Sequence, residues 1–168
     1  MTDKLFQANS TRIDPYKNFN FRVLFGTEVV AGVSKVSGLK QTIEVVEHRD
    51  GGDLSTKRKS PGLATFEPIT IERGLSHSTM FEDWATLVYA PTGPGDISLK
   101  DFRRDITIEL YNRQGVKVKA WHAYRCWVSE YTAAPEFDAN GNAIAFETII
   151  LQNEGFSRDL AVTEKREF

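Results

Sequence analysis

The side chains that could do chemistry are few and widely separated. The three histidines, His48, His77 and His122, show no paired spacing, and the single cysteine, Cys126, has no partner in a CxxC motif. A metal site needs several such ligands to be brought together. The sequence therefore predicts no metal site, and a lone cysteine allows no disulfide within the chain.

Carboxylates are the next candidates for acid and base chemistry. Glu44 and Glu47 lie on a predicted strand, and Glu82 and Asp83 lie at the start of a predicted helix, where solvated surface charge and the helix dipole explain them. There is no GxSxG, P-loop or GxGxxG motif, and no helix follows Gly51-Gly52 to aim amides at a phosphate. We expect no enzyme and no cofactor; a hydrolase that uses carboxylates is the remaining enzymatic alternative.

The segment from Asp138 to Asn142 has the alternating acid and amide side chains of a calcium loop. It lacks two features that such a loop needs, because position six is Ala143 where a glycine is required and position twelve is Ile149 where a glutamate is required. Asn140-Gly141 is instead typical of a hairpin turn.

Basic and aromatic side chains raise the question of nucleic acid or sugar binding. Lys57-Arg58-Lys59 is a short run in a chain whose 21 Lys and Arg against 23 Asp and Glu give a net charge of −2. A solvated loop or a subunit contact explains the run better than nucleic-acid binding. Trp121 and Trp127 could form a stacking platform, so a monomeric β-sandwich that binds sugar or peptide stays open, although packing is the commoner role.

Length and composition indicate one ordinary globular domain. The chain has 168 residues, of which 40% are hydrophobic and 26% charged. We expect a single domain over 1–168, with an irregular segment at 1–15 and a charged tail at 157–168. The sequence has no signal-peptide core and no apolar run of about 18 residues, so we expect synthesis in the cytoplasm and no membrane anchor.

Alternating apolar residues predict strands in the first half of the chain. Phe19, Phe21, Val23 and Phe25 share one face of the clearest strand, and Val29 to Val33 and Ile43 to Glu47 follow. His48 to Gly62 is polar with glycines, which predicts an exposed long loop or β-hairpin. Thr65 to Arg73 returns to the sheet, with Pro68 favouring an edge strand or an irregular start.

One helix is predicted from Ser76 to Ala90. Phe81, Trp84, Leu87 and Val88 recur at helical spacing, Thr79 and Glu82 can form a capping box, and Pro91 ends the run. Its single apolar stripe predicts that it covers an open end or flank of the sheet.

The second half predicts two further strand units. Ile106 to Tyr111 and Val116 to Tyr131 form a hairpin, and Ala143 to Gln152 is the last strand. In the long arm, one face is expected to carry Trp121, Ala123, Arg125 and Trp127 and the other His122, Tyr124, Cys126 and Val128, with both at least partly covered. The fold class is mainly β: a small β-barrel or β-sandwich with one flanking α-helix.

The order of these motifs resembles the phage tail-tube proteins. Asp14-Pro15-Tyr16-Lys17-Asn18-Phe19-Asn20-Phe21-Arg22-Val23 and Val36-Ser37-Gly38-Leu39 look like the family's opening, and Glu47-His48-Arg49-Asp50-Gly51-Gly52 resembles its glutamate-tyrosine-arginine-glutamate-glycine-glycine element. Arg58 to Leu63, Ile69 to Gly74, Phe81 to Trp84 and Asn140 to Gly155 follow in the family's order. The chain departs from the pattern at His48 and in a longer, Gly- and Pro-rich insert at Pro91 to Arg103.

The resemblance implies the inner tube of a contractile tail, as in phages, bacteriocins and extracellular injection systems. Family members form stacked hexameric rings inside a sheath, so the implied partners are copies of the chain itself, sheath, baseplate or hub, spike and tube-terminator proteins, with nucleic acid only as cargo in the lumen. A tube initiator or baseplate-proximal ring is the closest alternative. The hypothesised contacts between subunits or rings are Arg49, Asp50, Gly51, Gly52, Asp53, Lys57, Arg58 and Lys59.

Overall fold

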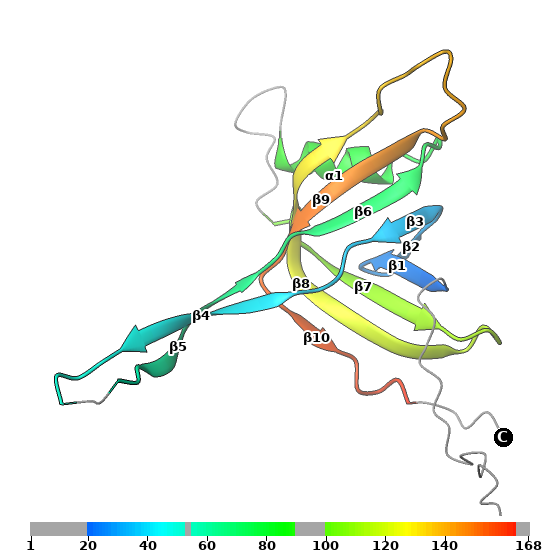
Figure 1. Cartoon of the computed structure of the whole chain (residues 1–168). Helices are drawn as coiled ribbons and strands as arrows, with labels where there is room; N and C mark the ends of the chain where they lie inside the picture. Colours follow the sequence, from blue (N-terminus) through cyan, green and yellow to red (C-terminus); the bar gives the residue numbers. More distant parts are fainter. Residues whose placement is uncertain (1–19, 53–54, 90–99, 164–168) are drawn as a thin grey trace, which may run out of the picture.

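The computed structural model describes residues 20–52, 55–89 and 100–163 of the chain (Figure 1). Ten strands and one helix form its regular structure, which confirms the predicted mainly β class. The elements are β1 Phe21–Phe25, β2 Glu28–Val30, β3 Val33–Val36, β4 Gln41–His48, β5 Arg58–Phe66, β6 Ile69–Gly74, α1 Met80–Val88, β7 Arg104–Tyr111, β8 Lys117–Thr132, β9 Phe146–Gln152 and β10 Phe156–Arg158. The predicted segment at 1–15 and the predicted helix stop at Pro91 lie outside the described residues.

All strand pairs are antiparallel, and β8 joins the two halves of the body. The strand order is β2-β1-β7-β8-β9-β6-β3, with β10 beside the first half of β8. The body is an open β-sandwich, because β2 and β3 at the two ends of this order do not pair with each other in the described residues. Strands β4 and β5 pair only with each other and form a separate hairpin.

A bulge at Arg125 lets β8 pair with β7 in one half of the body and with β9 in the other. Ile106 pairs with Ala123 whereas Arg104 pairs with Cys126, so β8 carries one extra residue at this point. Arg125 has φ 53°, and its backbone N–H donates to the Asp105 carboxylate at 2.8 Å. The predicted faces of this strand are therefore wrong: Ala123 and Cys126 both pack in the core, whereas a regular strand would place them on opposite faces.

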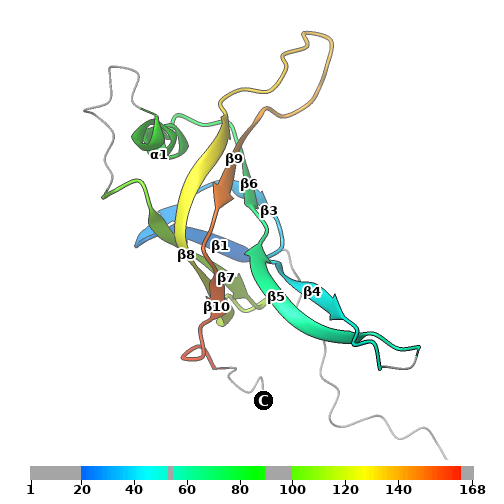
Figure 2. The same ribbon diagram turned by 90° about the vertical axis from the view of Figure 1, so that its left-hand side faces the viewer.

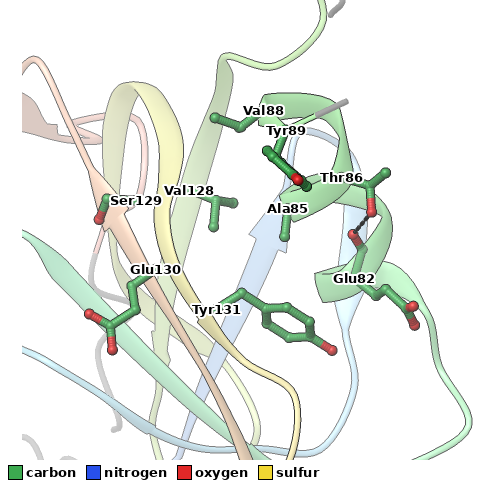
Figure 3. Close-up of a pocket in the computed structure, with 9 residues that line it drawn as sticks. All are labelled: Glu82, Ala85, Thr86, Val88, Tyr89, Val128, Ser129, Glu130 and Tyr131. Carbon is green, nitrogen blue, oxygen red and sulfur yellow. Dashed lines mark hydrogen bonds between the residues drawn. The ribbon is translucent and has the colours of Figure 1, made fainter. Parts of the chain in front are cut away.

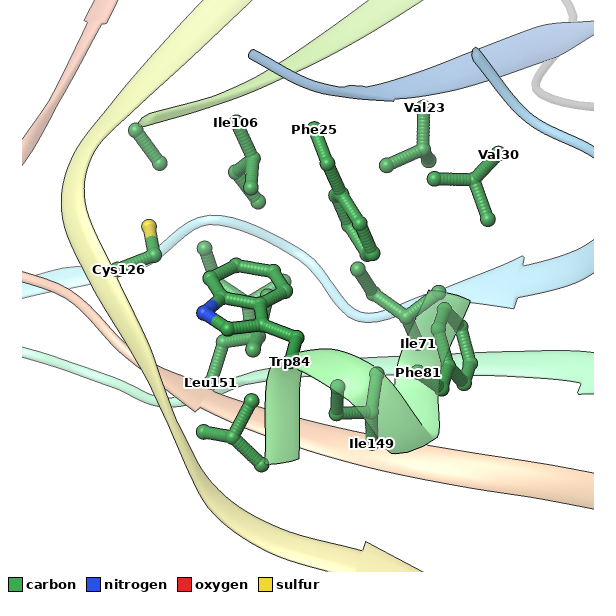
Figure 4. Packing of buried hydrophobic residues seen from close by; sticks show 13 residues of the cluster. Val23, Phe25, Val30, Ile71, Phe81, Trp84, Ile106, Cys126, Ile149 and Leu151 are labelled. Carbon is green, nitrogen blue, oxygen red and sulfur yellow. The ribbon is translucent and has the colours of Figure 1, made fainter. Parts of the chain in front are cut away.

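The helix packs its apolar stripe into the sandwich, as predicted. Phe81 and Trp84 are fully buried, and the Phe25 ring lies 4.6 Å from Trp84, centroid to centroid (Figure 4). The Trp84 indole N–H donates to the carbonyl of Phe102 at 2.7 Å, which satisfies its polar atom inside the core.

The predicted capping box is wrong, and the helix is shorter than predicted. Thr79 occupies the N-cap position, but its hydroxyl donates to the Asp83 carboxylate at 2.8 Å and makes no side-chain cap bond to the backbone. The helix ends at Val88 because Tyr89 is extended.

The structure differs from three other predictions about the strands. The expected strand from Val29 to Val33 is two strands, since Gly32 turns the chain between them with φ 77°. Strand β6 is an interior strand between β3 and β9, with Pro68 just before it, so the edge alternative is wrong. The predicted tail begins with β10, which pairs with β8 through Phe156 and Ala123.

A buried ion pair joins β6, β9 and the helix. The Arg73 guanidinium contacts the Glu147 carboxylate, and both side chains are almost inaccessible to solvent. Arg73 also donates to the carbonyl of Ser78 at 2.6 Å and lies 4.1 Å from the Phe81 ring centroid. Tyr131 donates to the second oxygen of Glu147 at 3.3 Å. The guanidinium and the carboxylate therefore each have a further hydrogen-bond partner besides one another.

We predict that Arg73→Met lowers the free energy of unfolding by about 3–5 kcal/mol, because it leaves the Glu147 carboxylate buried without its cation. Urea unfolding measures this change. The double variant Arg73→Met/Glu147→Leu should recover part of the loss. The control is Lys35→Met, which removes the exposed partner of Glu72 at 3.3 Å and should cost less than about 1 kcal/mol. Equal losses in the two single variants would contradict this account.

Candidate assembly interface

The hairpin of β4 and β5 projects away from the body (Figures 1 and 2). Every residue of β4 is exposed, and so is every residue of β5 except Phe66. A two-stranded ribbon of this kind is at best marginally stable alone in water. Its length and exposure make it the candidate contact surface of the described part of the chain.

The base of the hairpin is fixed to the body. The Phe66 ring packs edge-on against Phe156 with centroids 5.9 Å apart, and Asn153 donates to the carbonyl of Glu67 at 2.9 Å. Lys40 and Glu67 form an ion pair of 2.5 Å beside these contacts. The root of the hairpin is thus anchored, whereas the rest has no support from the body's core.

A bulge near Gly62 sets the shape of the hairpin. Ile43 pairs with Ala64 but Val45 pairs with Pro61, so β5 carries one more residue than β4 here. A Cβ atom on Gly62 would lie 3.0 Å from Val46 Cγ2 and 3.3 Å from the carbonyl oxygen of Glu44. Only glycine fits this position without movement of β4.

The predicted contact residues gather at the tip of the hairpin. Arg49, Asp50, Gly51 and Gly52 follow β4, Lys57 precedes β5, and Arg58 and Lys59 begin β5, while Asp53 lies outside the described residues. The structure brings Lys57 to 2.8 Å and Lys59 to 4.0 Å from the Glu47 carboxylate, and His48 to 3.0 Å from Asp50. The predicted exposed loop or hairpin is confirmed as a hairpin, with longer strands than predicted.

Sequence reasoning missed the apolar face of this hairpin. The register places Ile43 and Val45 opposite Ala64 and Pro61, on the same face as Glu47 and Lys59. Ile43 is 48% exposed and Val45 59%. Complete burial of an exposed aliphatic side chain contributes about 1.5–3 kcal/mol to the free energy of association or folding. Burial of the exposed halves of Ile43 and Val45 would therefore still stabilise a contact. The alternation of Ile43 and Val45 was visible in the sequence, but it predicts a half-buried strand and does not tell which molecule buries it.

A second surface that sequence reasoning missed is a groove between α1 and β8 (Figure 3). Its volume is about 420 Å³, and its walls are mostly apolar. Ala85, Val88 and Tyr89 line it from the helix side and Val128 and Tyr131 from the strand. Burial and the neighbouring Glu147 raise the pKa of Tyr131, which keeps its hydroxyl protonated and able to donate.

The titratable groups elsewhere have structural explanations. Thr107, His122 and Asp159 form a hydroxyl, imidazole and carboxylate chain, with Thr107 Oγ1 2.9 Å from Nδ1 and Asp159 3.4 Å from Nε2 of His122. Thr107 and His122 are direct cross-strand partners, and the chain ties the segment after β10 to the sheet. Burial raises the pKa of the Cys126 thiol to about 12, so the thiol is a poor nucleophile.

The described residues contain neither a metal-binding cluster nor a helix that could span a membrane. No cluster of three or more His, Cys, Asp or Glu side chains in the described ranges is arranged to hold a metal ion. Within those same ranges, no helix has the length and apolar character needed to cross a membrane.

Comparison with known families identifies the class of protein to which this mainly β fold with its projecting hairpin belongs. The family model for the T4-like virus tail tube protein gp19 matches residues 17–157. The chain therefore belongs to the T4-like tail tube protein family. No curated protein matches it significantly.

Solved structures of tube-related proteins resemble this chain in fold, and some also in sequence. One similar structure is a chain of the sheath–tube complex of the PVC extracellular contractile injection system in its extended state. The two chains are 28% identical, with a TM-score of 0.71, and the match covers 86% of this chain and 91% of that chain. A chain in the anti-feeding prophage tube-terminating cap structure is 26% identical, with a TM-score of 0.72 and coverage of 92% and 99%. A structure of Hcp1 from Flavobacterium johnsoniae, 17% identical with a TM-score of 0.51 and coverage of 83% and 94%, shares the fold. These matches support a tube protein of contractile injection systems.

We predict that Gly62→Val disturbs the hairpin and leaves the body intact, because the added side chain meets the backbone of β4. Hydrogen exchange should rise across 41–66 and stay unchanged in β7 and β9. Gly52→Ala is the matched control, since a Cβ there meets nothing within 4 Å. Unchanged exchange in the hairpin of Gly62→Val would show that the bulge does not need glycine.

Proposed function

We propose that this chain is a structural subunit of the inner tube of a contractile, phage-tail-like injection apparatus. In this proposal, copies assemble into hexameric rings that stack into a hollow conduit, which is driven outward when a surrounding sheath contracts. The observation that carries the proposal is the family match over residues 17–157. The hexamer is inherited from the family resemblance.

The proposed mechanism is passive, and no residue performs catalysis. The body supplies a rigid wall, because its sheet is continuous through β8 and its core is filled by the helix. The hairpin supplies a contact arm, because it is long, exposed and anchored only at its base. Stacking such subunits needs a heterologous interface, in which one surface of a copy meets a different surface of the next.

The proposed partners are further copies of the chain, a sheath protein, baseplate or hub and spike proteins, and a tube terminator. Support comes from the names of the similar structures, which describe a sheath–tube complex and a tube-terminating cap. Synthesis in the bacterial cytoplasm fits the single, buried and unpaired Cys126. Nucleic acid would enter only as cargo, since the net charge is −2.

We expect the purified protein to form six-fold rings or hollow tubes with a central hole at high concentration. Negative-stain electron microscopy together with size-exclusion chromatography tests this expectation. A particle that stays strictly monomeric at every concentration, with or without baseplate proteins, would overturn the tube proposal. It would favour the monomeric binding module instead, which a ligand-dependent fluorescence change of Trp121 or Trp127 would reveal.

We further propose that the hairpin tip makes polar contacts with an adjacent subunit or ring. The residues are Arg49, Asp50, Gly51, Gly52, Asp53, Lys57, Arg58 and Lys59. Support comes from the exposure of the described members of this set and from the projection of the hairpin away from the body (Figure 2). Charged groups at the edge of an interface steer association and set its salt dependence.

We expect charge reversal at the tip to shorten tubes without unfolding the subunit. Lys57→Glu and Lys59→Glu, singly and together, should reduce mean tube length in electron micrographs while thermal unfolding of the monomer changes little. Lys35→Glu is the control, because Lys35 lies on β3, away from the hairpin. Tubes of normal length in the double variant would remove Lys57 and Lys59 from the contact.

A further inference from the structure

The connection between β8 and β9, residues 133–145, carries an exposed Asn-Gly pair. This loop projects beyond the ends of the two strands (Figures 1 and 2). Asn140 and Gly141 are both exposed, and they form the only Asn-Gly pair in the sequence. The backbone nitrogen that follows an asparagine can attack its side-chain amide, and glycine hinders this attack least because it has no Cβ atom. The pair is therefore a candidate site for a covalent change.

The side chain of Asn140 is free to turn toward that nitrogen. The side-chain amides of Asn20 and Asn153 donate to backbone carbonyls at 3.3 and 2.9 Å, and the side chain of Asn112 accepts two backbone N–H groups at 2.9 and 3.0 Å. Asn140 uses only its backbone N–H, which donates to the Asp138 carboxylate at 2.9 Å, and its side-chain amide has no hydrogen-bond partner within the described ranges. No bond to the described residues has to break before this side chain can react.

The backbone does not need glycine at position 141. Gly115 and Gly155 have positive φ angles, whereas Gly141 does not. A Cβ atom on Gly141 would lie 3.5 Å from the carbonyl oxygen of Asp138 and 3.7 Å from its Cβ atom, which are ordinary contacts. Alanine can therefore replace Gly141 without moving its neighbours, so the chemical effect of glycine can be separated from its effect on folding.

One hydrogen bond opposes the attack. The Gly141 N–H donates to the carbonyl of Asp138 at 3.1 Å and must leave this acceptor before its nitrogen can react. The bond closes a turn in an exposed loop, and such backbone bonds open locally at little cost in free energy, far below that of global unfolding. The folded chain is thus expected to expose the nitrogen repeatedly.

We propose that Asn140 deamidates spontaneously through a succinimide ring formed with Gly141. The Gly141 nitrogen loses its proton and forms a bond to Cγ of Asn140, the Cγ–Nδ2 bond breaks, and the side-chain nitrogen leaves as ammonia. Water then opens the ring at either of its carbonyl–nitrogen bonds. The products are aspartate, in the normal backbone, and isoaspartate, in which the backbone runs through the former side chain. The reaction consumes water alone and needs no oxidant or cofactor.

The reaction would change both the charge and the path of the loop. It places a new carboxylate close in sequence to Glu136 and Asp138, where like charges repel one another. The isoaspartate product also inserts an additional carbon atom into the backbone beside the turn that Asp138 closes. The reaction does not depend on assembly into a tube, since all its groups belong to one loop of one chain.

Peptide mapping of the purified full-length protein tests the proposal. The protein is incubated in mildly alkaline buffer, which favours loss of the proton from the Gly141 nitrogen, and is then digested at acidic pH. Mass spectrometry finds the product because replacement of the amide –NH2 by –OH adds about 1 Da. Fragmentation of the peptide assigns the change to one asparagine, and chromatography separates aspartate from isoaspartate.

Asn142 is the matched control within the same loop. It is exposed, its side-chain amide has no hydrogen-bond partner within the described residues, and Ala143 follows it in place of glycine. We expect Asn140 to convert at least about tenfold faster than Asn142, because only Asn140 precedes a residue without a Cβ atom. Gly141→Ala should slow the conversion of Asn140 by a similar factor and leave thermal unfolding unchanged. The comparison of Asn140 with Asn142 needs no variant, so it stands even if Gly141→Ala does not fold.

The same incubation of the chain unfolded in urea shows whether the fold permits the reaction. Conversion of Asn140 in the unfolded chain but not in the folded one would overturn the proposal, because it would show that the turn at Asp138 keeps the Gly141 nitrogen closed. Equal rates at Asn140 and Asn142 in the folded chain would overturn it as well, and so would the absence of conversion in both states. Faster conversion at Asn140 in the folded chain, with both products present, would establish the site.

Discussion

The buried contact between Arg73 and Glu147 is the constraint on which the arrangement of the body depends. It links two neighbouring strands, β6 and β9, and reaches the loop before α1 through Ser78. The same guanidinium lies over the Phe81 ring, so the first turn of the helix is fixed by a charge and by apolar packing together. The network adds directional contacts to the packing of Trp84 and to the hydrogen bond from its indole to Phe102.

The network also reaches the groove. Tyr131 contributes its hydroxyl to Glu147 and its side chain to the groove wall, and Glu82 and Ala85 lie on the helix that Arg73 holds. The position of α1 relative to β8 sets the width of the groove. A buried ion pair is expensive to form and contributes little net stability compared with apolar packing, but its directional bonds specify one arrangement of the elements that carry it.

Much of the body could be predicted from the sequence, and the exceptions depend on contacts between distant residues. The alternation of Phe21, Val23 and Phe25 and the helical spacing of Phe81 and Trp84 record a single buried face, and the structure confirms both. The change of face along β8 could not be predicted, because it depends on Asp105 holding the backbone of Arg125. The burial of Arg73 was equally hidden, since its partner lies 74 residues away.

The hairpin root at Phe66 and Glu67 also bears on how subunits come together. In the proposed tube, an arm that the body holds only at its base loses conformational freedom along the rest of its length when it docks on a neighbour. A single docked arm is therefore a weak link. The end of a growing tube would offer several contacts to each arriving subunit. Such a subunit would stay bound far longer there than on a single isolated partner. Elongation of existing assemblies is then favoured over the formation of new ones in free solution.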